Sequence, residues 1–214
     1  MKLEKTLGLS LITLVLLSFN SYGEEASNQM AACNEALDKA DYSLATQVAD
    51  TILKQNNKQS DALLCKGRAL DALGKTEEAE KTLISAVSNA PAGFDTTIAN
   101  LVLGNYYKQH QNADLALASY QKSLDSSQQQ QNQKFIRISH NLMAEAYIEK
   151  QDYNAALKSY QAGSQLANND NERADSFERL AEVYQSLKQL DKAVEFQLKA
   201  VVMQKVSGTL DQYA

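Results

Sequence analysis

The stretch LGNYYKQHQNADLALASYQKSL, residues 103–124, decides how the chain folds. Counted from Gly104, small residues follow at +12 and +19 and large ones at +3 and +16 (Ala116, Ser123, Tyr107 and Tyr120). Small side chains let two antiparallel helices approach closely, and large ones fill the space between them. Asn112 falls midway, and asparagine is favoured in turns. The stretch therefore predicts a helix hairpin that reverses near Asn112.

The same offsets recur along most of the chain. The five origins are Cys33, Gly67, Gly104, Ala144 and Ala181, which lie 34, 37, 40 and 37 residues apart. One hairpin cannot bury its apolar face alone, whereas stacked neighbours can. We interpret the longer spacings as helices extended by about one turn, for example around residues 128–133. The pattern predicts an all-helical stack of repeats.

These repeats resemble the tetratricopeptide repeat family over about residues 26–205. The resemblance is most specific in residues 103–107, 116–124 and 152–156 and in Pro91, which closes the second repeat, and it is weaker in the first and last repeats. It implies an all-α, right-handed superhelical solenoid of about five helix hairpins. The implied repeats are residues 26–59, 60–96, 97–134, 135–173 and 174–205.

The resemblance also implies a binding surface. Members of the family bind peptides on the concave face, which the first helix of each hairpin lines. The residues just after each origin are expected to face this groove: Asn34, Arg68, Asn105, Glu145 and Glu182. The residues three before each origin are expected on the same side: Met30, Leu64, Leu101, Asn141 and Glu178. The groove would be apolar near its N-terminal end and acidic near its C-terminal end, where Glu149 and Asp175 also lie. Alternatively, these polar residues form an ordinary solvated face.

Residues 1–23 have the layout of a secretory signal peptide. Lys2 and Lys5 precede an uncharged apolar run from residue 7 to 19, and small residues at Ser21 and Gly23 precede Glu24. We expect cleavage after Gly23, a mature solenoid over residues 24–205 and a periplasmic location. Residues 206–214 would form a tail or begin a further helix. An uncleaved membrane anchor, or a lipid on Cys33, are the alternatives.

Export bears on the two cysteines, Cys33 and Cys65. An oxidising compartment favours pairing of thiols within reach of each other. Both cysteines lie on first helices of consecutive repeats, which pack side by side in the family. We expect a disulfide between them; the alternative is two buried free thiols that act as small apolar residues.

Other classes of function lack support in the sequence. The net charge is −5 and the basic residues do not cluster, which argues against nucleic-acid binding. The two histidines, His110 near a turn and His140 on an inward-facing position, are not spaced as metal ligands. No phosphate-binding loop or nucleophile motif is present. We expect no enzymatic activity, cofactor, metal or small-molecule substrate.

Three functions fit these expectations. The first is a scaffold or adaptor of the bacterial cell envelope that binds a protein or peptide and associates with an envelope complex. The second is a periplasmic chaperone for a specific exported client. The third is a non-catalytic module of a larger exported protein.

Overall fold

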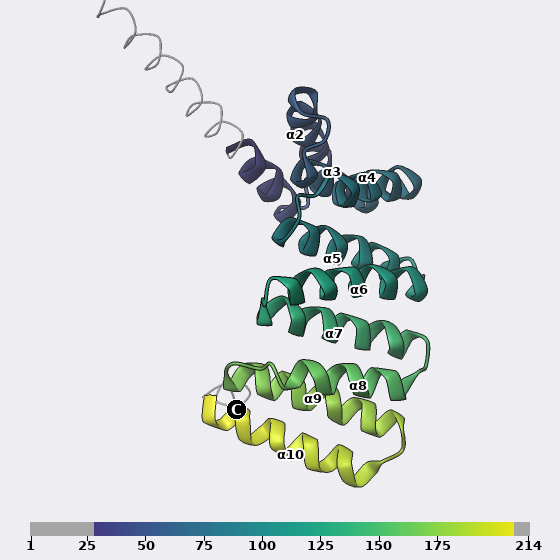
Figure 1. Cartoon of the computed structure of the whole chain (residues 1–214), viewed down its shortest axis with the longest axis vertical. Coiled ribbons are helices and arrows are strands. Elements are labelled where there is room, and N and C mark those ends of the chain that lie inside the picture. Colours follow the sequence, from purple (N-terminus) through teal and green to yellow (C-terminus); the bar gives the residue numbers. More distant parts are fainter. Residues whose placement is uncertain (1–27, 208–214) are drawn as a thin grey trace, which may run out of the picture. The chain divides into compact units, whose positions relative to one another are not determined.

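The computed structural model describes residues 28–207, which form ten helical segments and no strand (Figure 1). They pair into five hairpins, as the offsets predict: residues 28–38 with α2 (Tyr42–Gln55), α3 (Ser60–Ala72) with α4 (Thr76–Asn89), α5 (Phe94–Gln109) with α6 (Ala113–Gln129), α7 (Gln133–Glu149) with α8 (Tyr153–Ser164), and α9 (Asp170–Ser186) with α10 (Leu190–Ser207). The prediction of an all-α chain of five hairpins is confirmed. The predicted signal peptide, its cleavage site and residues 208–214 lie outside the described residues.

Most helices after α4 are longer than those before it. α2, α3 and α4 have 14, 13 and 14 residues, whereas α6 and α7 have 17 each. Both of these flank the turn at residues 130–132, so the extra length lies where the wide spacing between repeats predicts it. α8 is the exception, with 12 residues.

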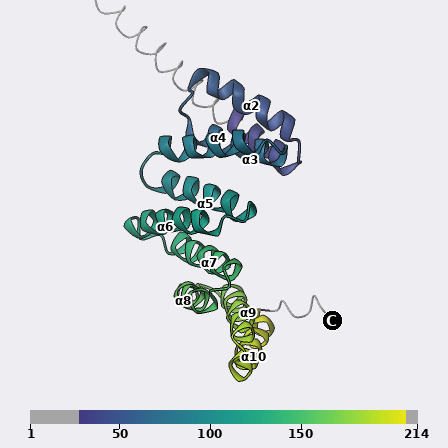
Figure 2. The ribbon, with the colours of Figure 1, turned by 90° about the vertical axis from the view of Figure 1, so that its right-hand side faces the viewer.

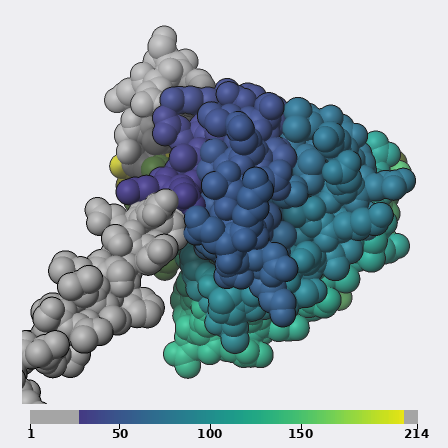
Figure 3. Space-filling model, turned by 90° about the horizontal axis from the view of Figure 1, so that it is seen from above, coloured from purple at the N-terminus to yellow at the C-terminus, as the bar shows by residue number. Residues whose placement is uncertain are grey.

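The chain divides between Asn89 and Ala90 into two compact units. Unit 1 holds the first two hairpins. One cluster of its core is built mainly from small side chains of residues 28–38, α2 and α3, among them Cys33, Ala45 and Cys65. Figure 3 shows a face of unit 1 on which side chains of residues 28–38 and α2 (purple to blue) lie at the surface.

Unit 2 holds the last three hairpins, and each of its helices from α5 to α10 packs against the next (Figures 1 and 2). A cluster of buried residues from α7, α8 and α9 forms part of its core, including Ala144, Tyr160, Leu180 and Tyr184. Repeats that each contact only their neighbours in the chain are typical of solenoids.

The close approach within a hairpin has a specific cause. A Cβ atom built on Gly104 would lie 2.4 Å from Cε1 of Tyr120, and one built on Gly67 would lie 2.5 Å from Cδ2 of Leu83. In the second and third repeats the origin thus packs directly on the large residue at +16. Ala116 at +12 is fully buried beside them. The spacing in the sequence reflects this contact between the two helices.

Side-chain caps fix where many helices begin. Asp41, Asn112, Asn132, Asp152 and Asn169 each accept a hydrogen bond from the backbone N–H three residues later. Such a cap stabilises a helix by about 1 kcal/mol. Asn112, where the sequence predicts the turn of its hairpin, therefore also starts α6, and Asp152 starts α8 in the same way.

Candidate functional site

In unit 2, a chain of charged side chains joins the first helices of three hairpins. Glu145 on α7 binds Lys108 of α5, and its Oε1 accepts a hydrogen bond from Arg179 Nη1 of α9 at 2.8 Å. Arg179 also donates from Nε to both oxygens of Asp175 at 3.0 Å. Glu145 is therefore held between two cations that come from the hairpins on either side. We call the side of α5, α7 and α9 that carries Asn105, Glu145 and Glu182 the first-helix face.

Two buried tyrosines of the second helices support this face from beneath. The hydroxyl of Tyr120 donates to Oδ1 of Asn105 at 2.8 Å, and the hydroxyl of Tyr160 accepts from Arg179 Nη1 at 3.4 Å. Burial raises the pKa of Tyr120, and the charges of Glu145 and Glu149 raise it further. Burial also raises the pKa of Tyr160, against the opposing effect of Arg179. Both hydroxyls therefore stay protonated and can hold their polar neighbours in place.

The five residues just after the repeat origins are placed as predicted for a surface. Asn34 and Arg68 in unit 1 are exposed, as are Asn105 and Glu182 in unit 2. Glu145 is half-buried because Lys108 and Arg179 flank it. Since Tyr120 occupies Oδ1 of Asn105, the amide NH₂ group of this residue is its remaining donor toward a ligand.

The five residues three before the origins do not form a surface of this kind. Leu64 and Leu101 are each 7% exposed, and Met30 packs against the core of unit 1. Asn141 packs against Gly163 of α8: a Cβ atom built on this glycine would lie 2.5 Å from Oδ1 of Asn141. Glu178 accepts a hydrogen bond from Gln204 on α10. The expected apolar lining by Leu64 and Leu101 is therefore wrong: both side chains are buried.

Helix geometry explains the difference between the two sets. Positions four residues apart are rotated by about 40° around an α-helix. In unit 2 that rotation turns Asn141 and Glu178 toward the second helix of their own hairpin, whereas Glu145 and Glu182 remain outside. The two sets therefore do not share one face, although they lie on adjacent turns.

Sequence reasoning missed the two cations of this face, Lys108 and Arg179. Lys108 is three residues after Asn105, and Arg179 is three residues before Glu182. Residues three apart on a helix are surface neighbours. Searching at that spacing from the predicted binding residues would have found both cations. It would also have indicated that they neutralise some of the carboxylates expected at the acidic end of the groove.

The histidines lie apart from this network. His110 is exposed at the C-terminal end of α5, with its ring centroid 4.5 Å from that of Tyr106. His140 is half-buried on α7, and burial lowers its pKa. Within residues 28–207, no three metal-binding side chains gather as a site. None of the described helices is both long enough and apolar enough to cross a membrane.

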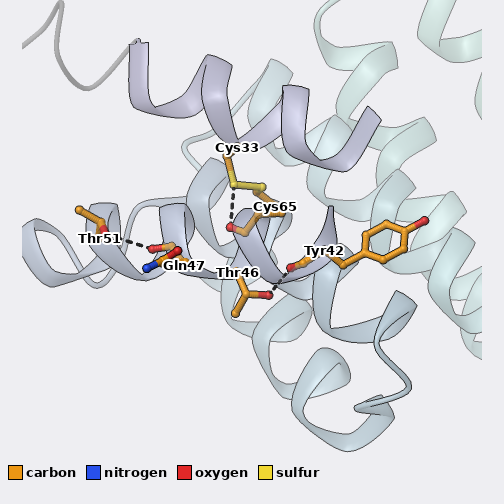
Figure 4. The surroundings of a disulfide bond; sticks show 7 residues. Cys33, Tyr42, Thr46, Gln47, Thr51 and Cys65 are labelled. Carbon is orange, nitrogen blue, oxygen red and sulfur yellow. Dashed lines mark hydrogen bonds between the residues drawn. A yellow bond between two sulfur atoms is a disulfide. The ribbon is translucent and has the colours of Figure 1, made fainter. Parts of the chain in front are cut away.

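The two cysteines meet in unit 1, as Figure 4 shows. Cys33 lies in residues 28–38 and Cys65 on α3, with their Cα atoms 6.4 Å apart and their sulfur atoms at bonding distance. Disulfides occur at Cα separations of about 4.4–6.8 Å. Both residues are almost fully buried, and Cys33 Sγ lies 3.3 Å from the carbonyl oxygen of Ala45. The fold thus brings together the pair that the sequence singled out.

Comparison with known proteins agrees with this architecture. The family profile for the N-terminal TPR repeats region of Psidin matches residues 28–165, and the tetratricopeptide repeat profile matches residues 174–205. A search of curated protein sequences finds no relative of the chain.

Solved structures share the fold at low sequence identity. BtubC (BKLC) from P. vanneervenii superposes with a TM-score of 0.77 at 12% identity, over 90% of this chain and 85% of that one. Nearly identical TPR-like repeats from Podosopora anserina give 0.73 at 14% identity, over 86% and 96%. MamA from Desulfovibrio magneticus RS-1 gives 0.66 at 15% identity, over 85% and 96%. With profiles matching well over half of its length, the chain belongs to the tetratricopeptide repeat family.

Proposed function

We propose that this chain is a protein–protein interaction scaffold of the bacterial cell envelope, and that it binds a segment of another polypeptide on the first-helix face. The observation that supports this most is the bridge from Lys108 through Glu145 to Arg179. It holds polar groups of three consecutive hairpins in fixed positions along one face. A preorganised row of this kind lowers the entropy lost when an extended peptide binds.

The chemistry of the face indicates the segment it would accept. The exposed amide of Asn105 can donate to a main-chain carbonyl of a peptide. Among the charged residues of the face, Glu145 and Asp175 are matched by Lys108 and Arg179, whereas Glu149 and Glu182 are exposed and remain in excess. An excess of carboxylates favours a segment that carries basic side chains.

The segment need not be apolar. Leu64 and Leu101, which the sequence suggested as an apolar lining, are buried. We therefore propose recognition by hydrogen bonds and charge, so that binding should weaken with salt. The same polar face suits a scaffold that binds one defined segment better than a chaperone, which must cover the varied apolar surface of an unfolded client.

The proposed location rests on residues 1–23 and on the cysteines. The basic start, apolar run and small-residue exit favour export and cleavage after Gly23. A disulfide between Cys33 and Cys65, which we propose for the exported protein, fits an oxidising periplasm.

Site-specific photocrosslinking in native cells would test the binding face. A photoreactive amino acid is placed at Asn105 or at Glu182, and at Lys122, an exposed residue on the second helix α6, as the matched control. We expect one defined protein to be captured from positions 105 and 182 but not from 122, and to co-purify from the cell envelope at fixed stoichiometry. Capture of the same protein from position 122 alone would refute the proposed face.

Charge reversal then tests the mode of binding. Glu149→Lys with Glu182→Lys should slow association with the captured partner about tenfold at low ionic strength, and the difference should fade at high salt. Asp125→Lys on the exposed surface of α6 is the control and should leave the rate unchanged. If the double variant associates as fast as the unchanged protein at low salt, charge does not guide binding.

A further inference from the structure

The helix α10 of unit 2 has two apolar sides, and within residues 28–207 only one of them is covered. On the inner side, Phe196 contacts the rings of Phe177 and Tyr184 of α9, with centroids 5.9 and 5.3 Å apart, and Ala200 is buried. The outer side carries six large apolar residues that are 41–65% exposed: Leu190, Val194, Leu198, Val201, Val202 and Val206. Within residues 28–207 only five other large apolar residues are this exposed, and they are scattered over α2 to α6 and the turn after α3. A contiguous exposed stripe of this kind marks an interaction surface.

The stripe is arranged symmetrically about Leu198. Val194 and Val202 lie four residues to either side of it, about 40° away around the helix, and Leu190 and Val206 lie eight residues away, about 80° around the helix at the edges of the stripe. Asp191 and Lys205 lie seven residues to either side, which places each about 20° from Leu198 around the helix. Five of the six apolar residues are thus placed symmetrically about Leu198, and Asp191 mirrors Lys205; Val201 is the exception, since its mirror position holds Glu195.

We propose that this stripe binds the same stripe of a second copy of the chain, with the two α10 helices antiparallel about a two-fold axis at Leu198. In that arrangement Leu198 meets Leu198 of the other copy, and Val194 shares a layer with Val202. Asp191 lies beside Lys205 of the other copy at both ends, so the central apolar residues and this charged pair each meet a suitable counterpart, whereas Val201 shares a layer with Glu195. A two-fold interface requires a self-complementary patch of this kind.

Other occupants fit less well. A lipid surface would not need an acid and a base placed symmetrically in the stripe. The stripe is about 27 Å long and about 10 Å wide, or roughly 270 Å², which is smaller than the ~800 Å² per partner of a standard interface, so the dimer should dissociate on dilution.

Sedimentation equilibrium over a range of concentrations tests the association, on the full chain and on the chain from Glu24. Leu198→Glu should raise the dimer dissociation constant about 100-fold, because two buried leucines are lost at once. The control Leu115→Glu, at an exposed leucine of α6, should leave it unchanged. A protein that stays monomeric at every concentration, or that dimerises equally well with Leu198→Glu, overturns the proposal. So does a chain that dimerises only after residues 208–214 are removed, since those residues would then cover the stripe.

The orientation is tested by charge exchange. Asp191→Lys and Lys205→Asp should each weaken the dimer about tenfold, since like charges then meet at both ends. The double variant should restore the affinity, because every acid again faces a base. If it does not, these two residues are not opposed in the dimer.

Cysteine crosslinking tests the same geometry without relying on affinity. Leu198→Cys should crosslink to itself under mild oxidation, because the residue lies on the two-fold axis. Val194→Cys should not crosslink alone, but should do so when mixed with Val202→Cys. If Val194→Cys crosslinks to itself as readily as Leu198→Cys, the helices are parallel and the proposed interface is wrong.

Discussion

Gly104 offers a direct test of how close packing supports the proposed binding face. Alanine at this position would place a methyl group 2.4 Å from Cε1 and 2.5 Å from Cδ1 of Tyr120. Ordinary contacts of this kind begin near 3.4 Å. Tyr120 is fully buried, so its ring cannot turn away without moving other atoms of unit 2. Its hydroxyl also holds Asn105, so a displaced ring should disturb the face as well as the core.

The expected cost follows from two opposing effects. Overpacking in a well-packed core costs about 1–3 kcal/mol. Replacing glycine by alanine inside a helix contributes up to about 1 kcal/mol in the other direction. We therefore expect Gly104→Ala to lower the free energy of unfolding by about 1–2 kcal/mol. At a urea dependence of about 2 kcal/mol per molar, this shifts the unfolding midpoint by roughly 0.5–1 M.

Gly163→Ala on α8 is the matched control. Its methyl group would lie 2.5 Å from Oδ1 of Asn141, but this oxygen ends a half-buried side chain that can rotate, and the nearest backbone atom, the Arg137 carbonyl oxygen, is 3.5 Å away. Unfolding in urea, followed by circular dichroism at 222 nm, should show a lower midpoint for Gly104→Ala and little change or a gain for Gly163→Ala. Equal stability of Gly104→Ala and the unchanged protein would refute the packing argument.

Three further predictions concern covalent structure, pH and processing. Reducing the Cys33–Cys65 pair should lower the free energy of unfolding by about 3.7 kcal/mol, the loop-closure value for a sequence separation of 32. Urea unfolding with and without dithiothreitol measures this difference, and a Cys33→Ser, Cys65→Ser variant should not respond to the reductant. Because burial depresses the pKa of His140, the folded state binds its proton less readily than the unfolded state, so stability should fall as the pH drops through about 6.5; His140→Gln should flatten thermal midpoints measured between pH 7.5 and 5.5. Mass spectrometry of the protein isolated from the periplasm should find Glu24 as its first residue, whereas an intact Met1 in the cytosol would contradict export.

Much of the fold follows from local spacing. Small residues at the origin and at +12, with a large one at +16, allow one close helix pair, and the contact of Gly104 with Tyr120 is that pairing in atomic detail. The last hairpin departs from this pattern because Gln197 occupies the +16 position, where it is exposed. Phe196, one residue earlier, packs on Tyr184 instead.

The candidate site was less predictable. The exposed positions of Asn105 and Glu182 follow from their place in the repeat, but burial of Leu64 and Leu101 depends on a rotation of about 40° between neighbouring turns. Sequence spacing does not resolve that rotation, because residues four apart count as one face in a periodic pattern.

The repeat and its helices could be predicted from the sequence alone, because they depend on residues close together in the chain or at a fixed period. Which charged side chains meet depends instead on the packing of one hairpin against another. Lys108 and Glu145 are 37 residues apart, and Glu145 and Arg179 are 34 apart. Their contact depends on how one hairpin stacks on the next. That stacking depends on how side chains from several helices together fill the space between the hairpins, so it cannot be read from any one segment of the sequence. The same holds for α10: its apolar residues are plain in the sequence, but which of them face outward depends on how the helix packs on α9.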